Sequence, residues 1–82
     1  MAQQYYFFKT MKVGGRQRLR PLPGQTEPSG RHIDESLNVQ ADSRMREDYP
    51  LGTVFCSESL ELRSLHSTTF YSAGAIYPIG LN

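Results

Sequence analysis

Residues 3–13, QQYYFFKTMKV, are rich in aromatic and β-branched residues and predict a β-strand. Successive side chains of a strand point to opposite faces of its sheet. One face of this strand would carry Tyr5, Phe7, Lys9, Met11 and Val13, and the other would carry Tyr6, Phe8, Thr10 and Lys12. Neither face is cleanly polar, which is typical of a central strand that is covered on both sides.

The C-terminal half of the chain predicts further strands. TVFCS at 53–57 is a short apolar run, SLELRSL at 59–65 alternates strictly, TTFYSA at 68–73 is β-branched and aromatic, and GAIYP at 74–78 begins a fourth strand. Turn-forming residues separate these runs. We therefore expect a meander of short antiparallel strands over 53–78.

A short string of tyrosine, proline, an aliphatic residue and glycine occurs twice, at 49–52 and 77–80. Proline fixes its own φ and disfavours helix in the preceding residue, and glycine permits conformations that other residues resist. The first copy predicts a turn that leads into the strand at 53. The second copy either closes the meander or precedes a strand that has been cut away. Shared turn chemistry explains the repetition better than duplication, because no wider similarity surrounds the copies.

Residues 14–31, GGRQRLRPLPGQTEPSGR, predict a long basic loop, since four glycines and three prolines punctuate 18 residues. Long loops are usually functional or disordered. We expect this segment to be the most mobile internal part of the chain without a ligand.

Residues 32–48 fit two patterns. Apolar residues at positions 33, 37, 41 and 45 suit a helix face, whereas those at 37, 39 and 41 suit a strand. The preferred interpretation is a strand near 36–41 and then a helical turn near 42–47, capped by Asp42 or Ser43. The alternative is a single helix over 33–47.

The pattern as a whole predicts one mostly β domain over residues 1–82. We expect a small barrel or a strongly twisted antiparallel sheet of five or six short strands with one short helical turn. A chain of 82 residues buries only about 60% of its unfolded surface. Its apolar content of 38% is low, which fits either a small domain with a long polar loop or the N-terminal domain of a larger protein.

Composition narrows the setting of the protein. The sequence has no apolar run long enough to cross a membrane as a helix, and its first residues do not predict a signal peptide. Its one cysteine, Cys56, excludes an internal disulfide. These features favour a cytoplasmic, nucleoid or virion-associated location, of which the cytoplasmic one is preferred, and no membrane partner.

Charge is strongly segregated along the chain. Residues 1–31 hold six basic residues and one acid, a net charge of +5, whereas residues 32–82 hold three basic residues and seven acids, a net charge of −4. The first 26 residues contain no acid. Such segregation of charge within one small domain is informative about the kind of partner that the protein binds.

The basic segment carries the candidate chemistry. Arg16, Arg18 and Arg20 are spaced by two, so in an extended backbone they would point the same way. Guanidinium groups suit phosphate oxygens, and an exposed aromatic ring upstream can stack on a nucleobase. The residues that we expect to bind nucleic acid are Lys9, Lys12, Arg16, Arg18 and Arg20 for phosphates, and Tyr6 or Phe8 for bases.

Other chemistries have little support. There is no phosphate-loop motif, and His32, Cys56 and His66 lack the spacing of metal ligands, so we predict no cofactor and no metal. Cys56 lies within an apolar run and is interpreted as a small buried thiol. Acids in predicted loops are usually only solvated, so no catalytic residue is predicted.

Two functions therefore compete. The first is a non-catalytic nucleic-acid-binding module, with DNA as the favoured ligand, that uses the basic loop and nearby aromatic residues. The alternative is a protein-interaction or assembly domain, of phage or mobile-element origin, that recruits another chain through an exposed aromatic strand or an open sheet edge. A small hydrolase ranks third.

Overall fold

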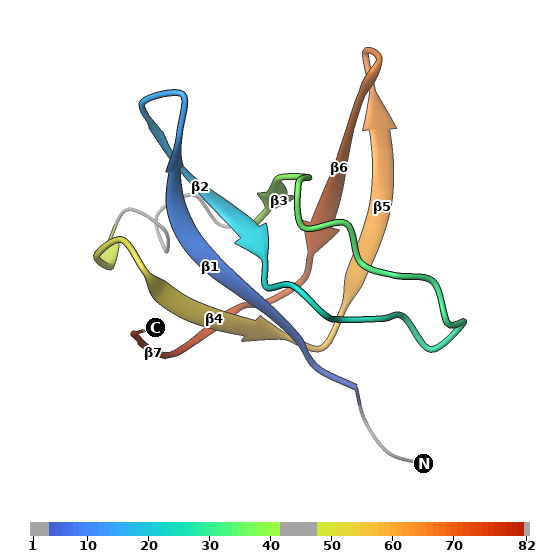
Figure 1. Ribbon diagram of the computed structural model, residues 1–82, viewed down its shortest axis with the longest axis horizontal. Coiled ribbons are helices and arrows are strands. Elements are labelled where there is room, and N and C mark those ends of the chain that lie inside the picture. The colour runs from blue at the N-terminus through green and yellow to red at the C-terminus, as the bar shows by residue number, and fades with distance from the viewer. Residues whose placement is uncertain (1–3, 42–47, 82) are drawn as a thin grey trace.

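The computed structural model describes residues 4–41 and 48–81, and the elements that it describes are all β-strands (Figure 1). The strands are β1 (Tyr6–Val13), β2 (Arg16–Pro21), β3 (Val39–Gln40), β4 (Thr53–Ser57), β5 (Leu60–Leu65), β6 (Thr68–Ala73) and β7 (Tyr77–Leu81). They form one sheet in the order β5-β6-β3-β2-β1-β4-β7. The prediction of a mostly β fold is confirmed, with seven strands instead of five or six.

The sheet is open and mixed. Every neighbouring pair is antiparallel except β3 and β6, which run parallel. Among the described residues no pairing joins the edge strands β5 and β7, so the expected closed barrel is not confirmed. No helix in the described part of the chain is long and apolar enough to cross a membrane.

The predicted meander over 53–78 is only partly correct. The hairpin of β5 and β6 forms as expected, but β4 pairs with β1 and β7 instead of β5. The physical reason is burial: four of the five residues of β4 are buried and none of β5 is, so β4 lies inside the sheet between β1 and β7 while β5 lies at an edge. Only Glu58 and Ser59 link β4 to β5, so the two ends of the sheet approach each other at this corner.

The curled sheet encloses one core on its inner face. Phe8 and Phe55 have no exposed surface, and Leu19 has 1%. The rest of the buried cluster is Tyr6, Ile33, Val39, Tyr71 and Ile76. Because β1 and β4 lie in one half of the sheet and β3 and β6 in the other, this cluster holds the two halves together.

The segment 14–31 is not a loop along its whole length, as we had expected. Gly14 and Gly15 have φ values of 59° and 80° and form a two-residue turn, after which β2 pairs with β1. Consecutive residues with positive φ suit the tight turns of hairpins, because their twist matches that of the strands. The density of glycine and proline hid this hairpin, although residues 16–21 do alternate with a period of two.

The rest of the segment 14–31, beyond β2, is also held by hydrogen bonds. The side-chain amide of Gln25 donates to the carbonyl of Phe7 at 2.9 Å and accepts from the Phe7 amide at 2.7 Å. Farther on, Thr26 and His32 form an isolated antiparallel bridge. The Gln25 contacts tie the chain between β2 and β3 to β1, and the bridge closes this connection on itself.

Residues 33–41 do not form the alternative single helix. Val39 and Gln40 form a short strand between β2 and β6, and the chain before it turns around Asp34. The Asp34 amide donates to the Tyr71 hydroxyl at 2.9 Å, which fixes this turn to the core. The pKa of Asp34 lies below its ordinary value, chiefly because the Ser36 hydroxyl and amide donate to the carboxylate. The helical turn expected at 42–47 lies outside the described residues.

The two tyrosine-proline strings have different roles. In the first, the Pro50 carbonyl accepts from the hydroxyl groups of Thr10 at 3.1 Å and Thr53 at 2.7 Å, and Gly52 has a φ of 90°. This string is the turn that leads into β4, as predicted. The second string, at 77–80, is not a turn, because it lies within β7 and pairs with β4.

Candidate functional site

The outward side of the β1–β2 hairpin gathers positive charge. In the register of the two strands, Lys9 lies opposite Arg20, and Met11 lies opposite Arg18. The intervening residues Thr10 and Leu19 are buried, so their neighbours point away from the core. We call Lys9, Arg16, Arg18 and Arg20 the basic face. The arginines share one direction, as their spacing predicted, but they do so on a strand instead of a loop.

The cations of the basic face are not equally available to a ligand, because some already contact other groups of the protein. The Arg20 guanidinium donates through Nε to Asn38 Oδ1 at 2.8 Å. Glu35 lines a hollow of about 150 Å³ together with Lys9 and Arg20, which reduces the positive field there. Within the described part of the chain, by contrast, the side chains of Arg16 and Arg18 make no hydrogen bond or ion pair. These two arginines are therefore the most available cations of the face.

Three of the predicted binding residues lie elsewhere. Tyr6 and Phe8 were expected to meet bases, but these residues are only 7% and 0% exposed and belong to the core. Lys12 is exposed, but its side chain points to the face of β1 opposite that of Lys9, because the two residues are an odd number of positions apart.

The expected alternation of the two faces of β1 was correct. The expectation that both faces are covered was wrong, because Phe7 and Met11 on the outward face are 36% and 37% exposed and only the other face packs on the core. Because neither face is cleanly polar, the sequence did not show that only one of them would meet the core.

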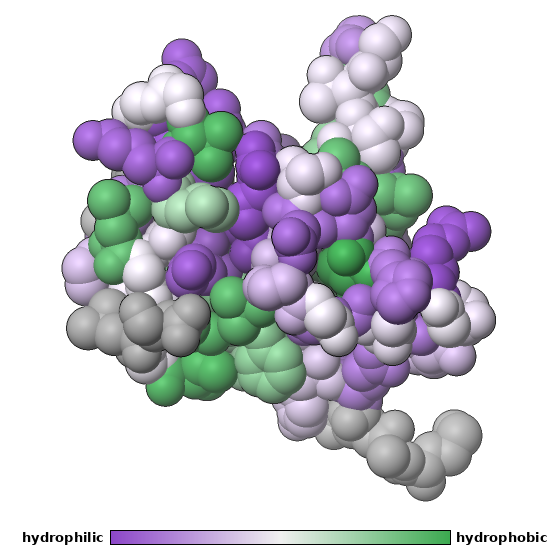
Figure 2. Space-filling view, viewed as in Figure 1, coloured by the Kyte–Doolittle hydropathy of each residue, from purple (hydrophilic) through white to green (hydrophobic). Residues whose placement is uncertain are grey.

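A second exposed patch lies where β1, β4 and β7 run side by side. Phe7 pairs with Cys56, and Cys56 pairs with Tyr77, so the three side chains leave the same side of the sheet. Phe7 is 36% exposed and Tyr77 is 55% exposed. Cys56 is a free, half-buried thiol, less buried than expected. Hydrophobic surface gathers over β1 and β4 at the lower left of Figure 2, and hydrophobic and hydrophilic residues are mixed farther up the hairpin.

Tyr5 lies beside this patch and contacts an acid. Its hydroxyl donates to Glu58 Oε1 at 3.4 Å. The negative charge of Glu58 raises the pKa of Tyr5 above its ordinary value, because a nearby carboxylate disfavours the tyrosinate anion. The folded protein thus holds this proton more tightly than the unfolded chain. Stability should fall as the pH rises between the ordinary and the raised pKa.

Replacing Glu58 with glutamine should lower the pKa of Tyr5 toward its ordinary value, because the substitution removes the carboxylate charge. An NMR titration of the Tyr5 ring between about pH 8 and pH 12 would measure this change. Glu61→Gln is the matched control, since Glu61 pairs with Arg63 on the other hairpin. An unchanged Tyr5 titration in Glu58→Gln would contradict the contact.

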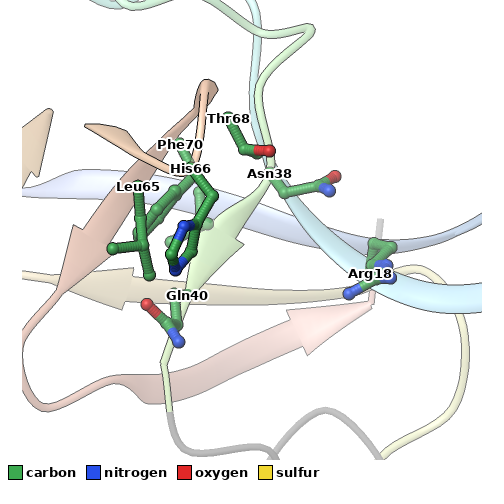
Figure 3. A pocket seen from close by; sticks show the side chains of 8 residues that line it. Arg18, Asn38, Gln40, Leu65, His66, Thr68 and Phe70 are labelled. Carbon is green, nitrogen blue, oxygen red and sulfur yellow. The ribbon is translucent and has the colours of Figure 1, made fainter. Parts of the chain in front are cut away.

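A groove separates the two hairpins, which rise on opposite sides of β3 (Figure 1). It has a volume of about 450 Å³. The residues that line it include Arg18, Asn38, Gln40, Leu65, His66 and Phe70. In Figure 3, Leu65, His66 and Phe70 lie together on one side and Arg18 lies on the other. Arg18 therefore belongs to both the basic face and the groove.

Sequence reasoning missed this groove. Phe70 and Tyr71 are adjacent in a predicted strand and must point to opposite faces, but nothing local shows which ring enters the core. The structure buries Tyr71 and leaves Phe70 half-buried in the groove. His32, Cys56 and His66, which the sequence analysis considered as metal ligands, lie in a bridge, a strand and a turn respectively.

The structure thus defines a small mixed β-sheet with two hairpins. A basic face lies on the β1–β2 hairpin, and a groove lies between the two hairpins. Comparison with protein-family models, curated proteins and solved structures finds no match to this chain.

Proposed function

We propose that this protein is a non-catalytic nucleic-acid-binding module, with DNA as the favoured ligand, that binds through its basic face. The observation that carries the proposal is the arrangement of Arg16, Arg18 and Arg20 at alternate positions of β2, on one side of the hairpin. Their Cα atoms follow one another at about 7 Å along the strand. Guanidinium groups in such a row can each contact a phosphate oxygen, in a bidentate manner where the geometry allows.

The setting of the row supports a role in binding. Arg16 and Arg18 make no ion pair with the described residues, so contact with phosphate would break no such pair. The short β1–β2 turn holds them on a paired strand, which limits the ordering cost on binding. A curled β-sheet, like the small barrel that we expected, is a scaffold on which strand faces can present cations and rings to nucleic acid. A single cysteine fits a reducing compartment, and we place the protein in the cytoplasm.

A salt titration tests the proposal. Contacts of Lys9, Arg16 and Arg18 with phosphates should give a slope of about −2 to −3 in a plot of log affinity against log salt concentration. Fluorescence anisotropy of labelled DNA and RNA oligonucleotides at several salt concentrations would measure that slope. If the protein binds neither nucleic acid at low ionic strength, the proposal is wrong.

The second candidate is a protein-interaction or assembly domain, and one observation favours it. Phe7, Tyr77 and Ile79 are exposed where β1, β4 and β7 lie together, and β7 is an edge strand. Exposed aromatic and aliphatic side chains beside an open edge suit β-strand addition by another chain. An interface of this kind would be largely insensitive to salt, so the same titration separates the two candidates.

A further inference from the structure

The groove between the hairpins combines three kinds of group that recognise a nucleobase. Arg18 supplies a cation from β2, Phe70 supplies an aromatic ring from β6, and Asn38 and Gln40 supply side-chain amides around β3 (Figure 3). Rings and arginine planes stack on unpaired bases, and amides donate to and accept from their edges. A volume of about 450 Å³ lies within the range of small-ligand sites.

The amide of Asn38 is already oriented by the protein. Its Oδ1 accepts a hydrogen bond of 2.8 Å from Arg20 Nε, which can only donate. This contact assigns the amide oxygen to Arg20 and leaves the amide nitrogen available as a donor to a ligand. Arg20 thereby connects the basic face with the groove and acts as a positioning residue for Asn38.

Phe70 borders more than one hollow. Besides the groove, it lines a neighbouring hollow of about 510 Å³ that also contains Gln40, Leu65 and Arg63. Phe70 therefore lies between two hollows and is only half-buried. A ring in this position is a suitable platform for a base.

We propose that the groove binds an unpaired base of a single nucleic-acid strand whose phosphates lie along the basic face. The base stacks on Phe70, its edge meets the amides of Asn38 and Gln40, and the adjoining phosphate meets Arg18. The inference rests on the proposed function, which it deepens by naming the ligand as single-stranded. Bases within a duplex are paired and stacked, so they cannot enter the groove without being displaced.

The test compares two probes with equal numbers of phosphates, oligothymidine and an abasic strand of the same length. The wild-type protein should bind oligothymidine more tightly, by about 5- to 150-fold for one stacked base. Phe70→Ala should reduce this preference toward one, while the salt dependence of binding stays unchanged. Phe70→Trp should restore it, because the larger ring keeps the stacking surface.

Leu62→Ala is the matched control for the hairpin. Leu62 is 46% exposed and lies two residues from Leu60, on the face of β5 opposite Arg63 and Leu65. This variant should keep the wild-type preference for oligothymidine. Circular dichroism of Phe70→Ala would confirm that the sheet is retained, and Phe70→Trp keeps the proposal testable if it is not.

The outcomes separate the two proposals. Equal, salt-sensitive binding of both probes by the wild-type protein would overturn the base site and leave the basic face in place. A preference that persists in Phe70→Ala would overturn it as well. Failure of the wild-type protein to bind either probe at low salt would overturn the proposed function itself.

Discussion

Replacing Arg16 and Arg18 together with glutamine should weaken the binding of oligonucleotides by about 25- to 60-fold at about 0.1 M salt. Each lost phosphate contact removes about 0.7 to 0.9 from the slope of log affinity against log salt. Two contacts should therefore lower the magnitude of the slope by about 1.4 to 1.8. Arg20 is left unchanged because it bonds to Asn38. Anisotropy titrations of both proteins at several salt concentrations would give the two slopes.

The matched control is the double variant Lys12→Gln and Arg31→Gln. It changes the net charge by the same amount, but Lys12 leaves the opposite side of β1 and Arg31 lies near Glu27 in the long connection. Its binding should stay close to that of the wild-type protein. If both double variants lose affinity equally, overall charge and not the basic face determines binding.

Phe8→Ala should reduce the free energy of unfolding by about 3 to 5 kcal/mol, because the ring is fully buried in the only hydrophobic cluster found among the described residues. A loss of this size is a large part of the stability of a small domain. The thermal midpoint should fall by more than about 10 °C. Urea denaturation followed by circular dichroism would measure the free energy directly.

Phe7→Ala is the matched control for Phe8→Ala. The two residues are adjacent and identical in type, but Phe7 lies on the outward side of β1 and is 36% exposed. Loss of the Phe7 ring should reduce the free energy of unfolding by much less than loss of the Phe8 ring. Phe8→Leu keeps the comparison measurable if Phe8→Ala fails to fold. Equal destabilisation by Phe7→Ala and Phe8→Ala would show that the assigned faces of β1 are wrong.

The predicted strands differ in how closely they match the structure, and burial explains the difference. The run at 53–57 was predicted to the residue, because a strand buried on both faces is a continuous apolar run between turn residues. The strand at 68–73 was also correct. The strand at 16–21 was missed, because three arginines and a proline concealed a period of two that only pairing with β1 stabilises.

The geometry of the arginine row was predicted in part for a related reason. The common direction of Arg16, Arg18 and Arg20 follows from their spacing once the backbone is extended, and the structure bears it out. The aromatic component was assigned to Tyr6 and Phe8, which lie in the core. Phe70, the ring that does lie near Arg18, is 52 positions farther along the chain, and no local pattern connects them.

The sequence by itself determined the mostly β class, the alternating faces of each strand and the segregation of positive charge into the first 31 residues. These are local properties, set by side-chain type and the period of an extended backbone. The tertiary structure alone decided which strands pair, which face of β1 meets the core, and that the hairpins enclose a groove. Those features depend on contacts between distant residues, because a face becomes interior only when another element covers it.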